Sequence, residues 1–163
     1  MRVAVIGAGG ASRAVTLALA DGGARVIVLN RDTERAAALA ADVSRNAGNA
    51  VEHAALSAEG LLSALRDASL LVNTTTVGMH PDVDASPVGA EYLRPNLTVC
   101  DIVYNPHETK LLRLARECGC PTVDGVEMLV GQGALAFELW TGAAAPVEVM
   151  RSVVREELAR AAH

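Results

Sequence analysis

Aromatic side chains are scarce in this 163-residue chain, which has two tyrosines, one phenylalanine and one tryptophan. Because 51% of the residues are nevertheless hydrophobic, alanine, valine and leucine must supply the core packing. Such side chains suit helices that pack closely on a parallel sheet. The chain also lacks any run of like charge, and its formal net charge is −5. This balance argues against a nucleic acid or an anionic membrane as the main partner.

Cysteine is scarce too, and Cys100, Cys118 and Cys120 form no CxxC pair. An odd count without a nearby histidine cluster is typical of reduced thiols in a cytoplasmic protein. A metal site at Cys118 and Cys120 is the alternative to a surface turn, but the four histidines show no metal-ligand spacing, and we expect no metal. The chain has no basic segment followed by an apolar one at its start, and no long apolar run elsewhere. We therefore expect a cytoplasmic protein with one domain over residues 1–163.

Short β-branched runs alternate with helical segments along the whole chain. We expect strands at Arg2–Ile6, Arg25–Leu29, Val51–Ala55, Ser69–Val72, Leu97–Val103 and Pro121–Val123, and helices near Ala11–Ala20, Thr33–Ser44, Ala58–Arg66, Glu108–Cys118, Val126–Thr141 and Val147–Ala161. This alternation implies right-handed crossovers and a doubly wound parallel sheet with helices on both faces. Six strands match the 3-2-1-4-5-6 order of a Rossmann-type α/β fold.

A glycine-rich turn, GAGGAS, joins the first expected strand to the first helix. Gly7 permits the tight turn, and Gly9 lets the backbone approach a pyrophosphate without a Cβ in the way. The helix N-terminus then offers N–H groups and a positive dipole end to the anion. Glycines also end strands for structural reasons alone. This turn, however, opens the first βαβ unit, which is the context that a dinucleotide site requires.

The residues after the second expected strand favour NADP over NAD. In NAD-binding domains an acidic residue ends this strand and binds the ribose hydroxyls, whereas here the strand ends in Asn30. Arg31 and Arg35 can converge on one phosphate, because each guanidinium donates two parallel hydrogen bonds. The alternative is that both arginines are solvated helix residues behind Asp32 as an N-cap. Asp32 also places a negative charge beside the proposed 2′-phosphate site.

Five motifs occur in order along almost the whole chain. They are GAGGASRA at residues 7–14, Asn30-Arg31, Asn73-Thr74-Thr75 with Gly78-Met79 and Pro81, Asp101-Ile102-Val103-Tyr104-Asn105-Pro106, and Asp124-Gly125 followed by MLVGQG at residues 128–133. Together they resemble the C-terminal, NADP-binding domain of the shikimate dehydrogenase family. The resemblance implies an oxidoreductase that transfers a hydride between NADPH and the ketone of 3-dehydroshikimate, a step of aromatic amino acid biosynthesis.

The resemblance also implies a set of site residues. The cofactor-binding residues that it implies are Gly7, Gly9, Gly10, Ala11, Asn30, Arg31, Arg35, Asn73, Thr74, Thr75, Val103, Gly125 and Met128, and the substrate contacts are Tyr104 and Gln132. In relatives the positions of Val103, Gly125 and Met128 surround the nicotinamide ring. Considered without the family, Tyr104 could lie in a turn after a strand and Gln132 on an exposed helix face. We expect Asp101 to be a structural group rather than a catalytic base.

The family's catalytic lysine and aspartate belong to an N-terminal substrate domain that these residues do not match. Lys110 is the only lysine, and it opens an amphipathic helix. We therefore expect the NADP(H)-binding half of a shikimate dehydrogenase-like enzyme, without catalytic residues of its own and inactive alone. It would bind shikimate or 3-dehydroshikimate only with a substrate domain, which a partner chain could supply, and it could form a homodimer. The alternatives are a sensing or assembly module without catalysis, and the cofactor half of a quinate-type dehydrogenase.

Overall fold

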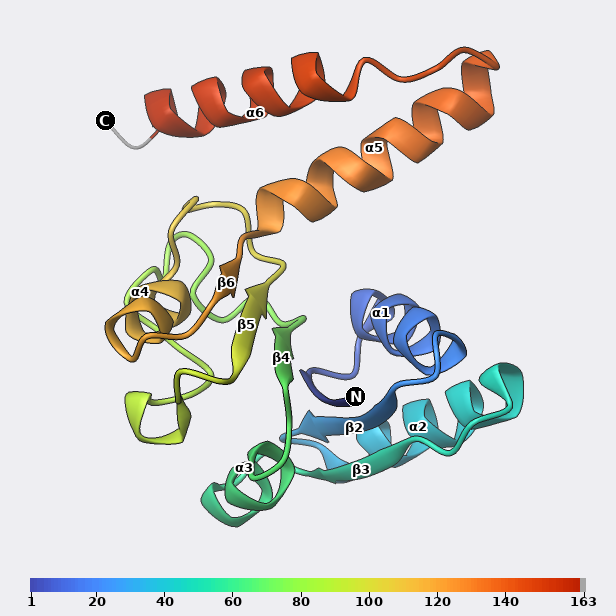
Figure 1. Cartoon of the computed structure of the whole chain (residues 1–163), viewed down its shortest axis with the longest axis vertical. Coiled ribbons are helices and arrows are strands. Elements are labelled where there is room, and N and C mark those ends of the chain that lie inside the picture. Colours follow the sequence, from blue (N-terminus) through green and yellow to red (C-terminus); the bar gives the residue numbers. More distant parts are fainter. Residues whose placement is uncertain (162–163) are drawn as a thin grey trace.

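Six strands form one parallel sheet in the computed structural model of this chain, which describes residues 1–161 (Figure 1). The strands are β1 (Arg2–Ile6), β2 (Arg25–Asn30), β3 (Glu52–Ala55), β4 (Leu70–Asn73), β5 (Thr98–Asp101) and β6 (Thr122–Val123). Their order is β3-β2-β1-β4-β5-β6, and each neighbouring pair is parallel. The predicted α/β fold and strand order are confirmed. Residues 162 and 163, which end the predicted domain and include His163, lie outside the described residues.

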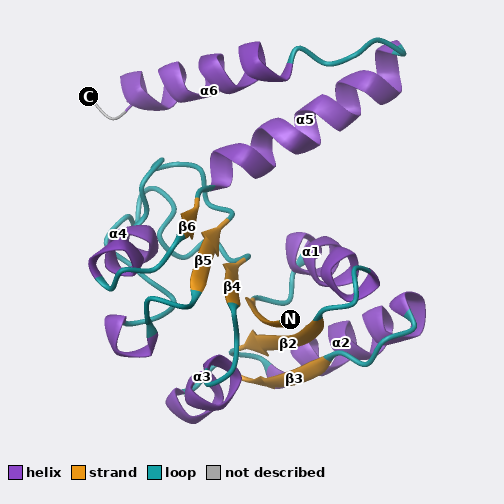
Figure 2. Cartoon of the chain, in the orientation of Figure 1, coloured by secondary structure: helices purple, strands orange, loops and turns teal. Residues whose placement is uncertain are grey.

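Helices cover both faces of this sheet, as predicted (Figure 2). The helices on the two faces are α1 (Gly10–Asp21), α2 (Thr33–Ala47), α3 (Ala58–Leu65) and α4 (Lys110–Glu117). The chain also forms a 3₁₀ turn η1 (Ala90–Tyr92) and two further helices, α5 (Gly125–Thr141) and α6 (Val147–Ala161). Side chains alternate along each strand, so Val3 and Val5 pack with α1 and α2 while Ala4 and Ile6 pack with α3 and α4. The small core side chains thus form two layers.

The fifth strand is shorter than predicted. The expected strand extended to Val103, whereas β5 ends at Asp101. The Asp101 carboxylate accepts the Val103 N–H at 3.1 Å, which removes that donor from the ladder and turns the chain out of the sheet. The following helix begins at Lys110 because the Thr109 hydroxyl caps it by accepting the Leu112 N–H.

The last two helices extend beyond the sheet. Figure 1 shows α5 leaving the edge of the sheet next to β6 and α6 returning alongside it. Glu127 on α5 holds α6 through Arg151 at 3.0 Å and Arg155 at 3.2 Å. Leu139 and Trp140 near the end of α5 are 83% and 81% exposed. None of the helices in residues 1–161 combines the length and hydropathy that crossing a membrane requires.

Candidate functional site

The glycine-rich turn lies at the carboxyl ends of β1, β2 and β4. Gly7 adopts φ +113°, and its N–H donates to the Leu29 carbonyl at 2.8 Å. A Cβ on Gly7 would lie 2.7 Å from Thr74 Oγ1, so both the backbone conformation and the neighbouring strand require glycine here. The buried Ser12 hydroxyl donates to the Gly7 carbonyl at 2.7 Å. The turn is therefore held by the two strands beside β1 and by the first helix.

The outer half of the turn is open. A Cβ on Gly9 or Gly10 would meet no atom within 4 Å, and both residues are exposed together with Ala11. Gly9 is the N-cap of α1, no side chain caps the helix, and its first turn holds no acidic residue. The N–H groups of this turn thus face solvent at the positive end of the helix dipole. No contact within the described protein requires glycine at position 9. Close approach of a pyrophosphate to the backbone would require it, because a Cβ would stand in the way.

The start of α2 presents two arginines beside this turn. Asp32 is the N-cap of α2, and its carboxylate accepts the Arg35 N–H at 3.1 Å. The Asn30 amide donates to the Asp32 carbonyl at 3.0 Å. Arg31 and Arg35 are exposed, and neither guanidinium has an ion-pair partner within residues 1–161. The Asp32 carboxylate therefore caps the helix, while both guanidiniums remain available to an anion.

The loop after β4 is fixed by a buried amide. Asn73 is completely buried, and its Oδ1 accepts from the Thr75 N–H at 3.1 Å and the Thr75 hydroxyl at 2.7 Å. The Thr74 hydroxyl donates to the Ile6 carbonyl at 2.6 Å, which ties the loop to β1. The Asn73 side chain faces the protein interior, and a cofactor contact at Asn73 stays a prediction. Thr74 and Thr75 are half-buried at the surface of the loop.

A buried carboxylate connects this loop to the next one. Asp101 accepts from the Asn73 amide at 2.9 Å and from the Thr109 hydroxyl at 2.7 Å, in addition to the Val103 N–H. Burial raises the pKa of Asp101, and the hydrogen bonds from Thr109, Val103 and Asn73 oppose that rise. The neighbouring Cys100 thiol has its pKa raised to about 11 by burial and by the carboxylates of Asp101 and Asp124. This thiol therefore stays protonated at neutral pH.

The residues predicted around the nicotinamide come from two segments that touch. A Cβ on Gly125 would lie 2.5 Å from the carbonyl oxygens of Ile102 and Val103, so the start of α5 packs directly on the loop after β5. Val103 is 3% exposed, whereas Met128 is 39% exposed. Close backbone packing is a structural reason for glycine at position 125. The sequence alone could not predict this contact, because Val103 and Gly125 are 22 residues apart in the chain.

The two predicted substrate contacts both reach the surface. Tyr104 is 41% exposed on the loop after β5. Gln132 is exposed on α5, and its amide donates to the Leu129 carbonyl at 3.0 Å. Met128, Gln132, Leu135 and Leu139 follow one another at helical spacing, so they share one face of α5. That face runs from the predicted nicotinamide position to the exposed end of the helix.

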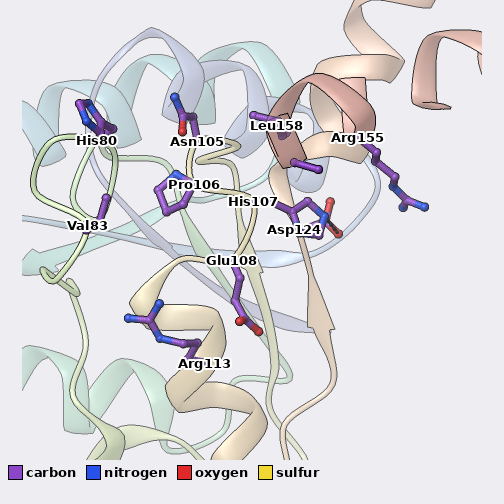
Figure 3. A pocket seen from close by; sticks show the side chains of 11 residues that line it. His80, Val83, Asn105, Pro106, His107, Glu108, Arg113, Asp124, Arg155 and Leu158 are labelled. Carbon is purple, nitrogen blue, oxygen red and sulfur yellow. Dashed lines mark ion pairs between the residues drawn. The ribbon is translucent and has the colours of Figure 1, made fainter. Parts of the chain in front are cut away.

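A cavity of about 900 Å³ lies apart from these residues, between the loops after β4 and β5 and helix α6 (Figure 3). Its walls combine apolar side chains with charged and imidazole groups; they are formed by His80, Val83, Asn105, Pro106, His107, Glu108, Arg113, Asp124, Arg155, Leu158 and Ala159. None of the predicted site residues lines it. The sequence could not indicate this cavity, because its walls come from loops and from α6, which are distant in the chain.

The parallel sheet and the open glycine turn define a Rossmann-type domain of the dinucleotide-binding class. The chain belongs to the shikimate dehydrogenase family: the family model described as "Shikimate / quinate 5-dehydrogenase" matches residues 1–90. A second model, "Shikimate 5'-dehydrogenase C-terminal domain", matches residues 125–155. The recognition made from the sequence motifs is thereby confirmed.

Individual relatives agree with this family and cover the chain almost completely. The shikimate dehydrogenase (NADP(+)) of Methanosarcina mazei is 53% identical over 158 residues, which are 96% of this chain and 56% of that protein. A crystal structure of shikimate dehydrogenase in complex with NADP+ superposes with a TM-score of 0.87 at 36% identity, over 96% of this chain and 54% of that one. The structure of quinate dehydrogenase from Corynebacterium glutamicum in complex with NAD superposes with a TM-score of 0.85 at 37% identity, over 93% of this chain and 53% of that one. The chain thus spans about half the length of these relatives.

Proposed function

We propose that this chain is the NADP(H)-binding half of a shikimate dehydrogenase-like oxidoreductase, and that residues 1–163 alone bind NADP(H) without substrate turnover. The observation that carries the proposal is the open glycine turn at the uncapped start of α1, next to Arg31 and Arg35. The names of the relatives support it, since the Methanosarcina mazei protein is an NADP(+)-dependent shikimate dehydrogenase. Three free cysteines in residues 1–161 are compatible with the cytoplasm, which is the compartment we propose.

Each part of the proposed cofactor site has a separate task. The N–H groups at Gly10 and Ala11 bind the pyrophosphate at the start of α1. Arg31 and Arg35 bind the 2′-phosphate, and the capping role of Asp32 keeps its carboxylate on the helix backbone. NADPH supplies the hydride when it is bound. Since hydride transfer is the chemistry of the cofactor, the task of the protein is to bind and orient the cofactor.

The substrate side of the site requires a second domain. The Lys110 amine donates a hydrogen bond to the Asp84 carbonyl at 2.8 Å. This contact gives Lys110 a structural role and does not make it a proton donor to a substrate. We propose that a substrate domain covers the face of α5 formed by Met128, Gln132, Leu135 and Leu139, and that shikimate or 3-dehydroshikimate binds against Tyr104 and Gln132. Exposed apolar faces of this kind mark interaction surfaces. Leu135 is 71% exposed, which supports this arrangement.

The arginine assignment is tested by Arg31→Ala/Arg35→Ala. Removing both guanidiniums removes the bidentate donors to the 2′-phosphate, so NADP affinity should fall by at least about tenfold while NAD affinity changes by less than about twofold. Isothermal titration calorimetry measures both. The control is Arg45→Ala/Arg66→Ala, which changes the net charge equally but leaves the start of α2 intact, and it should bind NADP like the wild type. Equal losses for NADP and NAD would remove the 2′-phosphate assignment.

Turnover by the purified chain tests the requirement for a substrate domain. With NADP and shikimate, the chain should reduce no cofactor above the protein-free background at 340 nm. Robust reduction of NADP would contradict the proposal. The quinate-type alternative is favoured by the likeness to quinate dehydrogenase, whose structure contains NAD.

A further inference from the structure

Ending β5 uses only one of the hydrogen bonds of Asp101, the one from the Val103 N–H. The Asp101 carboxylate is completely buried at the carboxyl end of β5, and Asn73 and Thr109 beside it are equally buried. A buried carboxylate is costly in an apolar interior unless hydrogen bonds compensate it.

The hydrogen bonds of Asp101 reach three separate segments. Oδ1 accepts from the Asn73 amide at 2.9 Å and from the Val103 N–H at 3.1 Å, and Oδ2 accepts from the Thr109 hydroxyl at 2.7 Å. Asn73 in turn accepts two hydrogen bonds from Thr75. One carboxylate thus connects the loop after β4, the loop after β5 and the start of α4.

Two of these segments carry residues assigned to the cofactor. Thr75 is half-buried on the loop after β4, and the backbone of Val103 touches the start of α5 at Gly125. The glycine turn and the start of α2, which serve the adenosine half, are not bonded to Asp101; they are held through Leu29, Ser12 and Asp32 instead. The glycine turn still packs on the loop after β4, because Gly7 lies against Thr74 and Thr75. The start of α2, with Arg31 and Arg35, is the part of the site that is held without Asp101.

We propose that Asp101 is a positioning residue for the nicotinamide half of the cofactor site. It fixes the loops at Thr75 and Val103 relative to each other, and it leaves the start of α2, which is assigned to the 2′-phosphate, unaffected. The inference rests on the proposed function, because that function assigns the nicotinamide to this end of the sheet. Preorganised backbone contributes to binding only while it is held in place, so a loosened loop weakens the contacts made by the nicotinamide half.

Two substitutions separate positioning from charge. Asp101→Ala leaves the donors of Asn73, Val103 and Thr109 without their acceptor. Asp101→Asn retains Oδ1 for Asn73 and Val103, and its new amide can donate to the Thr109 hydroxyl, which accepts as well as donates. Asp101→Asn should therefore rescue the geometry although the charge is lost.

The test compares two ligands by calorimetry on the purified full chain. NADP spans the whole site, whereas adenosine 2′,5′-bisphosphate reaches only the adenosine half. Asp101→Ala should raise the Kd for NADP by at least about fivefold and change the Kd for the bisphosphate by less than about twofold. Asp101→Asn should stay within about twofold of the wild type for both ligands. As a spectroscopic check, the fluorescence of bound NADPH, which reports the nicotinamide environment, should change in Asp101→Ala and not in Asp101→Asn.

Several outcomes would overturn the proposal. Asp101→Ala that binds NADP like the wild type, or that loses both ligands equally, shows that Asp101 does not act on the nicotinamide half. If Asp101→Ala does not fold, Thr109→Val removes one hydrogen bond of Asp101 together with the side-chain cap of α4 and keeps the side-chain shape. The same split between ligands is expected, or the proposal fails. A wild-type chain that binds neither ligand refutes the proposed function itself, and the inference with it.

Discussion

Replacing Gly9 by alanine should separate cofactor binding from folding. In the protein alone, a Cβ at this position meets no atom within 4 Å, and φ −98° with ψ −168° is an extended backbone conformation that alanine adopts. Alanine is a poorer N-cap than glycine by up to about 1 kcal/mol. At about 2–4 °C per kcal/mol for a domain of this size, the Tm should fall by no more than about 4 °C.

Cofactor binding should suffer more than stability. The added methyl group stands on the surface that the pyrophosphate must approach, and inserting a methyl into a close contact costs about 1–3 kcal/mol. This cost corresponds to a rise in the Kd for NADP of about 5- to 150-fold. Calorimetric titration measures the Kd, and circular dichroism during heating measures the Tm. Gly131→Ala is the control, because its Cβ also meets no atom within 4 Å and it lies on α5. A Gly9→Ala variant that binds NADP as tightly as the wild type would refute a pyrophosphate at this turn.

Two further predictions concern stability. Gly125→Ala should lower the free energy of unfolding by about 1–3 kcal/mol, because the added Cβ would lie 2.5 Å from two carbonyl oxygens. Gly131→Ala should instead raise the free energy of unfolding by about 0.5–1 kcal/mol, because alanine is the better helix residue and its Cβ meets no atom. Equal effects of the two substitutions in chemical denaturation would exclude the close packing at Gly125. Thr16→Val should raise the free energy of unfolding by about 1 kcal/mol, because the buried Thr16 hydroxyl has no hydrogen-bond partner in the described part of the chain. Thr16→Ser keeps the hydroxyl and should show no gain; a gain of the same size would contradict this reasoning.

The sheet could be predicted from the sequence because its signals are local. The central strands β1, β2 and β4 are short apolar runs, and each is followed by a turn or a helix start that the residues themselves encode. Arg2–Ile6 was predicted with its observed bounds, and β2 extends only one residue further than predicted. The strand order then followed from handedness and the known topology of such folds. The helix caps at Asp32 and Asp124 are local as well.

The support of the candidate site could not be predicted in the same way. Asn73 ends β4 in a position typical of a ligand contact, but whether its amide faces outward depends on Asp101, 28 residues away. The end of β5 was missed for the same reason, since the Asp101 side chain captures the Val103 N–H. The cavity beside α6 is lined by residues from segments that are distant in the sequence. Hydrogen bonds and ion pairs between distant segments leave no periodic signal in a sequence. The assignment of individual cofactor contacts therefore stays a prediction.

Titration of the purified chain with NADP and with NAD tests most directly whether this chain alone holds an NADP site. We expect NADP to bind at least about tenfold more tightly than NAD, because only NADP carries the 2′-phosphate that Arg31 and Arg35 are proposed to bind. Binding of NAD as tight as that of NADP, or tighter, would show that these arginines do not recognise the cofactor. Absence of binding for both would contradict a preformed dinucleotide site at the glycine turn.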